Sequence, residues 1–363
     1  MSIKPRKAVD DLPDYKGGRS LDSIKREFGF EKVIKLASNE NTLGFSPLAK
    51  AALEKVTSFY PDGAAYNLRK RLSEKLGVSI DNLILGNGSF ELIFLVALAF
   101  LENGEETIGV NPSFGWYRNV TKIMGGTYVT VPVKDFHVDL DAILAAITPK
   151  TKIIWLCNPN NPTGTIFTAK ELDDFLAKIR DDIIVVLDEA YIAFVSEPNA
   201  PDAISLMQKH DNIISLRTFS KLEGLANLRI GYGIAQPELL AYLNKVRMPM
   251  NVNGAAQLAA LAAIDDEEFK QKTLENIRSE RKRYYEAFDR WGVRYTISNT
   301  NFVFFDAGTD TKPIVAEILS KTGVLIRSGV DFGHPTTLRI SIGSPEENKL
   351  VLELLEPYFG GKK

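Results

Sequence analysis

The segment RTFSKLEGLANLR, residues 217–229, contains the lysine around which we expect the fold to be organised. Lys221 follows a short apolar run at 213–216, which predicts a buried strand that ends near Thr218 and Ser220. The lysine would therefore lie on a loop at one edge of a sheet, where ligands of α/β folds bind. From this segment alone, a solvated lysine on a turn is an equally good interpretation.

The rest of the chain has the composition of a compact globular protein. With 363 residues it is long enough for two domains, and its 45% hydrophobic and 25% charged residues are close to the average for soluble proteins. A net charge of -2 provides no broad basic surface, which disfavours nucleic acid and anionic membranes as partners. We expect a small-molecule ligand.

Cysteine and histidine are too sparse for a disulfide framework or a metal site. The single cysteine, Cys157, lies in the apolar run IIWLC, which predicts a small buried side chain and fits a reducing compartment. The longest apolar run, 92–101, is too short to cross a bilayer, and the N-terminus has no signal-peptide pattern. We therefore predict a cytoplasmic protein. We also predict that it binds no metal, since His137, His210 and His334 do not have the spacing of metal ligands.

From residue 82 onward, seven apolar strand patterns alternate with helix patterns as far as RIGYGIA at 229–235. Such alternation predicts an α/β fold in which a sheet lies between helices. One of these helices has a clear start, because Thr168 and Glu171 form a capping box. After about residue 245 the pattern changes to a long charged helix and three further strands, which predicts a second, smaller α+β domain.

We divide the chain accordingly into three segments. Residues 1–45 are expected to form an N-terminal arm and part of the small domain, 46–250 the large ligand-binding domain, and 251–363 the C-terminal small domain. Within the large domain, a PDG turn precedes a helix with a leucine stripe, and Tyr60 lies in that turn.

Three polar motifs lie at predicted strand ends. GNGSFE at 86–91 comes directly before an apolar helix, so backbone amides at the helix start can bind an anion, although a plain turn is the commoner use of such glycines. NPNNPTG at 158–164 follows a strand, and Asn161 can donate a hydrogen bond into the same crevice. KLASNENTLG at 35–44 is a third polar loop that can line a pocket.

The carboxylate of Asp188 lies at the end of the apolar strand IIVVLD. Burial of a carboxylate costs several kcal/mol unless a cation or donor compensates, and an N-cap or an ion pair is the commoner explanation. Its coincidence with an anion site, an asparagine loop and a lysine at one sheet edge favours pyridoxal phosphate. Lys221 would bind the cofactor covalently, Asp188 would keep the pyridine nitrogen protonated, and the phosphate would meet Ser220 and Arg229.

The order of these motifs resembles that of fold-type I aminotransferases, and most closely that of histidinol-phosphate aminotransferases. The resemblance covers nearly the whole chain and rests on LASNENTLG, YPDG, GNGSFE, CNPNNPTG, LDEAY, RTFSKLEGLANLRIGY, NVN, NFVFF and LRISIG. It implies a mostly parallel seven-stranded sheet between helices in the large domain, and a homodimer with shared active sites.

The resemblance also implies roles for individual residues. Lys221 and Asp188 are the implied catalytic residues. The implied cofactor-binding set is Gly88, Ser89, Phe90, Phe114, Asn161, Asp188, Tyr191, Thr218, Ser220, Lys221, Arg229 and, from the neighbouring subunit, Tyr60. The implied substrate-binding residues are Tyr15, Asn39, Arg327 and Arg339. Arg339 alternates with Leu338 and Ile340, so we expect it to face away from the core.

Two residues depart from the pattern of the family. Phe114 stands where many relatives have tyrosine, so it can stack on a ring but cannot donate a hydrogen bond. Glu223 replaces an apolar or aromatic residue two positions after the lysine, where its charge can shift protonation or substrate preference. Neither departure removes an implied catalytic group.

The resemblance implies transamination of histidinol phosphate with 2-oxoglutarate or glutamate, by a two-step reaction, in histidine biosynthesis. An aromatic amino-acid aminotransferase is the closest alternative, and a phosphothreonine decarboxylase is a more distant one. A cofactor-binding sensor fused to a DNA-binding module belongs to another class of protein. The N-terminal arm is too short for a winged helix and the net charge is wrong for a DNA module, which disfavours that alternative.

Overall fold

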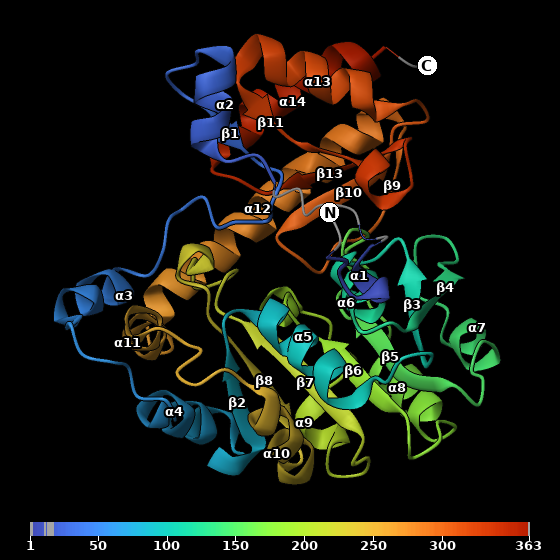
Figure 1. Ribbon diagram of the computed structural model, residues 1–363. Helices are drawn as coiled ribbons and strands as arrows, with labels where there is room; N and C mark the ends of the chain where they lie inside the picture. The colour runs from blue at the N-terminus through green and yellow to red at the C-terminus, as the bar shows by residue number, and fades with distance from the viewer. Residues whose placement is uncertain (1–2, 11, 13–17, 362–363) are drawn as a thin grey trace.

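The computed structural model describes residues 3–10, 12 and 18–361, and its largest unit is an α/β domain (Figure 1). The strands of its sheet follow the order β2-β8-β7-β6-β5-β3-β4, and only β8 is antiparallel to its neighbours. The predicted mostly parallel seven-stranded sheet is confirmed. Its strands are β2 Leu83–Gly86, β3 Glu106–Asn111, β4 Thr127–Pro132, β5 Thr151–Cys157, β6 Ile184–Asp188, β7 Ile213–Thr218 and β8 Gly231–Ala235.

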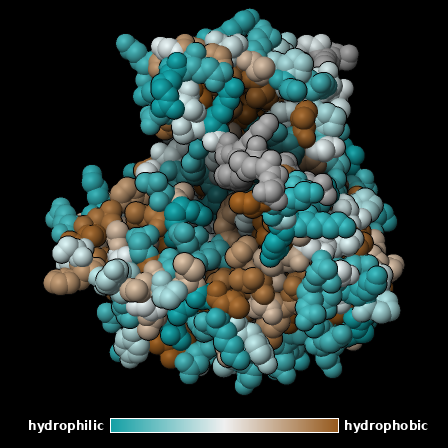
Figure 2. Space-filling view, viewed as in Figure 1, coloured by the Kyte–Doolittle hydropathy of each residue, from teal (hydrophilic) through white to brown (hydrophobic). Residues whose placement is uncertain are grey.

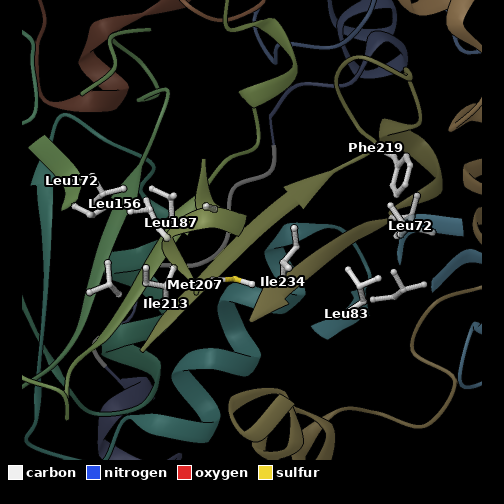
Figure 3. Close-up of a cluster of buried hydrophobic side chains, with 14 of the residues drawn as sticks. Leu72, Leu83, Leu156, Leu172, Leu187, Met207, Ile213, Phe219 and Ile234 are labelled. Atoms are coloured by element: carbon white, nitrogen blue, oxygen red, sulfur yellow. The ribbon is translucent and has the colours of Figure 1, made fainter. Parts of the chain in front are cut away.

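Helices cover both faces of this sheet because side chains of a strand alternate between its two faces. In β5, Ile153 and Trp155 pack in one hydrophobic cluster with α5, whereas Ile154 and Leu156 pack in the opposite one, part of which is drawn in Figure 3. Fully buried strands of this kind are typical of parallel sheets. The helices are α4 Tyr66–Leu76, α5 Ser89–Phe100, α6 Trp116–Ile123, α7 Leu140–Ala145, α8 Ala169–Leu176, α9 Ala203–Leu206 and α10 Pro237–Val246.

The predicted helix boundaries agree with the structure where capping residues mark them. The Thr168–Glu171 capping box begins α8, and Ser344 with Glu347 begins the last helix in the same way. Single turns of 3₁₀ helix interrupt the loops at η1 Leu53–Lys55, η2 Ile80–Asn82, η3 Ile192–Phe194, η4 Ala226–Leu228 and η5 Gly329–Phe332.

The C-terminal part of the chain forms a smaller α+β domain, at the top of Figure 1. The core of this domain lies between a four-stranded antiparallel sheet, ordered β12-β13-β10-β9, and three helices. Its elements are α12 Glu267–Trp291, β9 Arg294–Tyr295, β10 Phe302–Asp306, α13 Thr311–Thr322, β12 Arg327–Ser328, β13 Thr337–Ser341 and α14 Pro345–Phe359.

The N-terminal residues join this C-terminal domain. Strand β1 (Ile34–Lys35) pairs in parallel with β11 (Val324–Leu325), next to helix α2 (Leu21–Phe28) in Figure 1. The predicted arm at 1–45 thus contains a helix that the sequence analysis did not identify, since α2 has only eight residues and only Ile24 of it is buried. A one-turn helix, α1 (Lys7–Asp10), contacts α6 instead.

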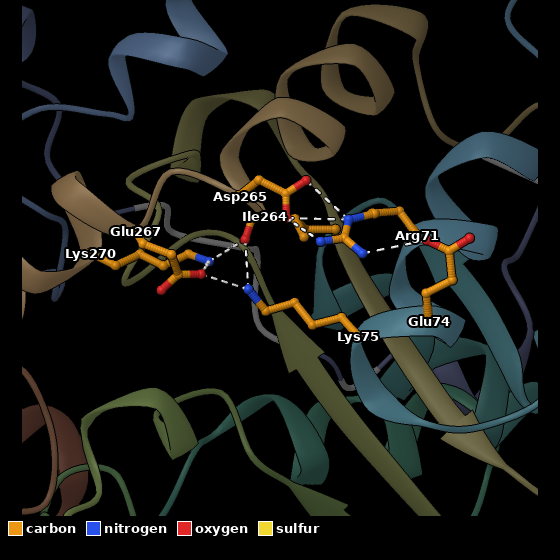
Figure 4. Close-up of polar contacts among 7 residues, drawn as sticks. All are labelled: Arg71, Glu74, Lys75, Ile264, Asp265, Glu267 and Lys270. Atoms are coloured by element: carbon orange, nitrogen blue, oxygen red, sulfur yellow. Dashed lines mark hydrogen bonds and ion pairs between the residues drawn. The ribbon is translucent and has the colours of Figure 1, made fainter.

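Helices α3 (Pro47–Ala52) and α11 (Gly254–Ala263) pack together at the corner where the two domains meet. Buried alanines of α11 belong to the same cluster as the large sheet. Polar contacts join the connection between α11 and α12 to α4: Arg71 pairs with Asp265 at 2.5 Å, and Lys75 pairs with Glu267, the first residue of α12, at 2.7 Å (Figure 4). The boundary at residue 250 stays a prediction, and the packing of α11 in the core of the large domain and of α12 in that of the small domain favours a boundary near the start of α12.

Within the described part of the chain, no helix is both long enough and apolar enough to cross a membrane.

Candidate active site

A cavity of about 240 Å³ lies at the carboxyl ends of the large-domain strands. Parallel strands bring the residues that follow them to one edge of a sheet, which explains why positions far apart in the sequence meet here. Ten of the predicted site residues line the cavity: Ser89, Phe90, Phe114, Asn161, Asp188, Tyr191, Thr218, Ser220, Lys221 and Arg229.

Lys221 extends from the loop after β7 into this cavity. Its Nζ atom donates a hydrogen bond to the carbonyl oxygen of Ser38 at 3.3 Å and lies 5.5 Å from the ring centroid of Tyr191. Burial lowers the pKa of the Lys221 amine to about 8, and the nearby positive charge of Arg339 acts in the same direction. Lowering the pKa increases the fraction of neutral amine near pH 7, and the neutral amine is the form that attacks a carbonyl group.

The loop that carries Lys221 is in close contact with residues 44–46, in the segment that joins the two domains. Gly224 has a φ of +73°, and a Cβ atom on it would lie 2.2 Å from the carbonyl oxygen of Gly44. The amide of Ser46 also donates to the carbonyl oxygen of Glu223 at 3.3 Å. Only glycine fits such a contact, so the sequence EGL fixes how closely this loop approaches its neighbour.

Asp188 lies at the floor of the cavity and is only 3% exposed. Its two carboxylate oxygens accept hydrogen bonds from the hydroxyl of Tyr117 at 2.7 Å and from the amide of Ala190 at 3.1 Å. Burial raises the pKa of Asp188 to about 6, and the Tyr117 hydrogen bond opposes that rise. The carboxylate is therefore arranged to meet a positive partner from inside the cavity.

The opposite end of the cavity is suited to an anion. Helix α5 begins at Ser89, and Gly88 before it has a φ of +73°. A Cβ atom on Gly88 would lie 2.5 Å from Nη2 of Arg229, so the guanidinium group occupies the space that a side chain at this position would need. The hydroxyls of Thr218 and Ser220 are 3.0 Å apart on the same side. Helix-start amides, two hydroxyls and an arginine together form a phosphate-sized set of donors.

Aromatic side chains form one wall of the cavity. The ring of Phe114 meets Phe90 edge to face, with centroids 5.0 Å apart, and meets Tyr117 in the same manner at 5.4 Å. Tyr117 in turn stacks on Trp155 at 5.3 Å. These contacts hold the Phe114 ring in place without a hydroxyl group, so a phenylalanine is sufficient to form a flat apolar wall here.

A series of hydrogen bonds runs from the small domain into the cavity. Nη1 of Arg339 donates to Oδ1 of Asn161 at 2.6 Å, and the amide of Asn161 faces the Tyr191 hydroxyl at 3.4 Å. Leu338 and Ile340 belong to the small-domain core, as alternation predicts. Arg339 points the other way but is only 5% exposed, because it is enclosed where the domains meet rather than open to solvent. Burial lowers the pKa of its guanidinium group to about 10.

Asn39 connects the same series to the segment between the domains. Its amide donates to the Tyr191 hydroxyl at 2.8 Å, and its backbone amide donates to the hydroxyl of Ser341 at 2.8 Å. The backbone of Asn39 has a φ of 57°, a left-handed conformation that asparagine tolerates better than most residues. Asn39 therefore bonds both domains at once.

Other predicted site residues lie outside the cavity. Arg327 is the cross-strand neighbour of Arg339, and its Nε atom lies 2.8 Å from a carboxylate oxygen of Asp331. Tyr60 is 87% exposed and does not line the cavity of its own chain. Tyr15 lies outside the described residues.

Some cavity residues were missed from the sequence. Tyr117 ends the sequence NPSFGWY at 111–117, three residues after Phe114, and the need of a buried Asp188 for a donor could have identified it. Glu40, in the SNENT loop, and Ser38 also line the cavity. Cys157 is buried at its floor, with Sγ 3.3 Å from the carbonyl oxygen of Pro159. Within the described ranges, no group of three or more metal-ligating side chains occurs.

Together these features define a class of protein. A lysine of lowered pKa, a buried carboxylate and an anion site surround one cavity at the sheet edge, which is the arrangement of an enzyme that works through a phosphorylated ring cofactor with a reactive carbonyl group.

Comparison with known proteins places the chain within that class. Residues 31–355 match the family model described as aminotransferase class I and II, and the chain belongs to this family. It is a transaminase. The chain is similar to the histidinol-phosphate aminotransferases of Brevibacillus brevis and Moorella thermoacetica, with 43% and 42% identity. These alignments cover 99% of both chains in the first case, and 97% of this chain and 92% of the relative in the second.

A solved structure agrees with these sequence relatives. The histidinol-phosphate aminotransferase of Sinorhizobium meliloti, determined in complex with pyridoxal-5'-phosphate, superposes with a TM-score of 0.91 at 28% identity and covers 99% of each chain. The predicted family and fold type are confirmed.

Proposed function

We propose that this protein is a pyridoxal-phosphate-dependent transaminase that exchanges the amino group between histidinol phosphate and 2-oxoglutarate or glutamate, in histidine biosynthesis in the cytoplasm. The observation that carries the proposal is that Lys221 and Asp188 line one cavity, which also has an anion site at the start of α5. The similarity to histidinol-phosphate aminotransferases over the whole chain supports the choice of substrate.

The residues fit this cofactor. The glycine at position 88 leaves the space that the guanidinium group of Arg229 occupies, and Thr218, Ser220 and the amides at the start of α5 complete the donors for a phosphate. Asp188, raised in pKa by burial, gains a positive partner when the pyridine nitrogen is protonated. Phe114 would stack on the ring, and Asn161 and Tyr191 would donate to its hydroxyl group.

Pyridoxal phosphate, when bound, supplies a ring that withdraws electrons from the reacting carbon. Lys221 would hold the cofactor covalently and, as a free amine, would carry the proton between the substrate carbon and the carbonyl carbon of the cofactor. Arg339 binds the acidic group of each substrate in turn, with Arg327, Asn39 and Tyr15 as its helpers. The enclosed position of Arg339 excludes water from that contact.

A second copy of the chain would complete the site. Large apolar side chains are exposed in the segment after α3, with Phe59 at 85% and Tyr60 at 87%. Brown surface gathers over the corner formed by α3 and α11 in Figure 2. Two adjacent aromatic side chains that are almost fully exposed indicate a surface that a protein partner covers. If the partner is a second copy of the chain, the homodimer would bring Tyr60 to the phosphate site of its neighbour. Light scattering that gave the mass of one chain would exclude this part of the proposal.

The test is a comparison of single-turnover rates in the purified holoenzyme. Histidinol phosphate and phenylalanine are each mixed with the cofactor-loaded protein, and the loss of the cofactor absorbance band is followed. We expect a clear preference for histidinol phosphate. A preference for phenylalanine would make the protein an aromatic amino-acid aminotransferase instead, and no reaction with either amine would contradict transamination itself.

A further inference from the structure

Glu40 has no role in the function described so far, yet it lines the same cavity as Lys221 and Asp188. These two carboxylates differ in exposure. Asp188 is buried at the floor, whereas the side chain of Glu40 is 39% exposed and therefore lies at the solvent end. Glu40 is close enough to Lys221 for its negative charge to raise the pKa of the lysine amine, against the larger effect of burial.

The backbone around Glu40 is held on both sides. Before it, Asn39 bonds to Tyr191 and to Ser341, and its carbonyl oxygen accepts from the amide of Asn301 at 3.0 Å. After it, the amide of Asn41 donates to the carbonyl oxygen of Leu222 at 3.0 Å. The motif Asn-Glu-Asn thus presents one carboxylate from a backbone that both domains fix, which is the condition for a specific polar contact.

One oxygen of the Glu40 carboxylate is already used. Lys35 of β1, whose side chain is 17% exposed, donates to Oε1 at 2.8 Å. The second oxygen, Oε2, has no hydrogen bond to any residue that the structure describes. An ionised carboxylate accepts at both oxygens, so Oε2 is available to a donor from a ligand in the cavity.

We propose that Glu40 selects the substrate by accepting a hydrogen bond from the imidazole N–H of histidinol phosphate. The inference rests on the proposed function and deepens it. The phosphate and the amino group of the substrate are assigned to other residues, which leaves the ring as the part that meets the solvent end of the cavity. An imidazole ring carries an N–H donor and a phenyl ring carries none.

A ligand with a phenyl ring in place of the imidazole would bind less tightly beside Glu40. A phenyl ring would cover Oε2 without a hydrogen bond, and an unpaired carboxylate oxygen is costly to desolvate. Discrimination of this kind is stronger than an apolar pocket can provide, because leaving a polar group of the enzyme unpaired penalises the analogue. Glu40 would thus distinguish histidinol phosphate from aromatic amino acids, while the phosphate site alone would not distinguish two phosphorylated amines.

The experiment uses two ligands that differ only in the ring: histidinol phosphate and phenylalaninol phosphate. Their kcat/KM values are measured with the wild-type holoenzyme and with Glu40→Gln and Glu40→Ala. We expect kcat/KM for histidinol phosphate to fall about 10-fold in Glu40→Gln, which keeps an acceptor but loses its charge, and up to about 100-fold in Glu40→Ala, which loses the acceptor as well. The value for phenylalaninol phosphate should change less than about twofold or rise.

A binding measurement separates recognition from chemistry. Dissociation constants of both ligands are obtained by calorimetry on the cofactor-loaded Lys221→Ala protein, with and without Glu40→Ala. The affinity for histidinol phosphate alone should fall. Glu27→Gln is the matched control, because Glu27 is also paired with a basic side chain, that of Arg19 at 3.1 Å, but lies on α2 and does not line the cavity.

The outcomes separate the two proposals. If the wild-type enzyme does not react with histidinol phosphate, the proposed function fails before Glu40 is tested. If it does react, but the Glu40 variants weaken both ligands equally or neither, selection of the imidazole by Glu40 is wrong. An equal loss for both ligands, with a changed pH dependence of the cofactor absorbance, would assign the effect to the charge of Lys221 instead.

Discussion

The two sides of the cavity are built in different ways. On the proposed cofactor side, Asp188, Ser220 and Arg229 all come from the large domain, and each has a hydrogen-bond partner in that domain. On the proposed substrate side, Arg339 comes from the small domain and Asn39 from the joining segment, and each bonds to the large domain. One side is fixed by a single sheet, and the other depends on how the two domains meet.

This difference implies that the two sides of the cavity contribute to different steps of the reaction. Residues at strand ends of one sheet are held by the core of that sheet, so they can be ready before any ligand arrives. Contacts between domains bury less surface than a core and permit relative motion. Substitutions on the first side should therefore affect the chemistry and the cofactor, whereas those on the second side should affect mainly the binding of substrates.

The largest effect is expected from Lys221→Ala on the cofactor side. Turnover should fall by a factor on the order of 10⁴, because no other group takes over the proton transfer. The loss is measured as a single-turnover rate with histidinol phosphate, and an unchanged circular dichroism spectrum would show that the fold is retained. Lys209→Ala, which removes an exposed lysine paired with Asp173, is the control and should be fully active. If the purified Lys221 variant retained turnover, Lys221 would not be the catalytic lysine, and the distinction between a cofactor side and a substrate side would fail.

On the substrate side, Arg339→Lys should raise KM for the substrates about 10- to 100-fold, because lysine cannot make the same forked contact with an acidic group. The dissociation constant of pyridoxal phosphate should change less than about threefold. Steady-state kinetics and a cofactor titration measure the two quantities. Arg290→Lys on the outer face of α12 is the control. A comparable loss of cofactor affinity would show that the two sides are not independent.

Tyr117→Phe tests the support beneath Asp188. The hydroxyl of Tyr117 stabilises the ionised carboxylate, so its removal should raise the pKa of Asp188 further above the ordinary value. The acidic limb of the kcat/KM profile should then move to higher pH by about one unit, with a loss of up to about tenfold at pH 6. Tyr242→Phe, at the half-exposed surface, should leave the profile unchanged. If the pH profile of kcat/KM did not move, the hydroxyl of Tyr117 would not influence the pKa of Asp188.

The smallest effect concerns Glu223, which lies behind the lysine loop in a second cavity with Lys270 of α12. Burial raises the pKa of its carboxyl from 4.5 to about 7. The folded protein therefore binds a proton that the unfolded chain releases, and stability is lost as the pH rises from 4.5 through 7.

Glu223→Gln cannot ionise and should avoid that loss. The variant should be more stable than the wild type by about 1 to 3 kcal/mol at pH 8 and nearly equal to it at pH 4.5. Thermal unfolding at the two pH values measures the difference, and Glu27→Gln serves again as the exposed control. A gain that is the same at both pH values would mean that the ionisation of Glu223 does not contribute.

The same division explains what the sequence could predict. Lys221, Asp188 and Asn161 each follow an apolar strand pattern, so a parallel sheet brings them together without further information. Gly88 was identified because a helix pattern begins directly after it. The positions of Arg339 and Glu40 depend instead on how two domains pack, which no local period encodes. Alternation gave the direction of Arg339 correctly, but its enclosure by Ala37 and Asn161 is a property of the domain arrangement.

Pairing between β1 and β11 has a consequence for synthesis of the chain on the ribosome. Ile34 meets Val324, so the first strand to leave the exit tunnel stays without its neighbour until almost the whole polypeptide has been made. The large sheet, complete at Ala235, can fold earlier. The Asn-Glu-Asn loop needs partners from both halves, and it would therefore be among the last parts of the molecule to reach its final shape.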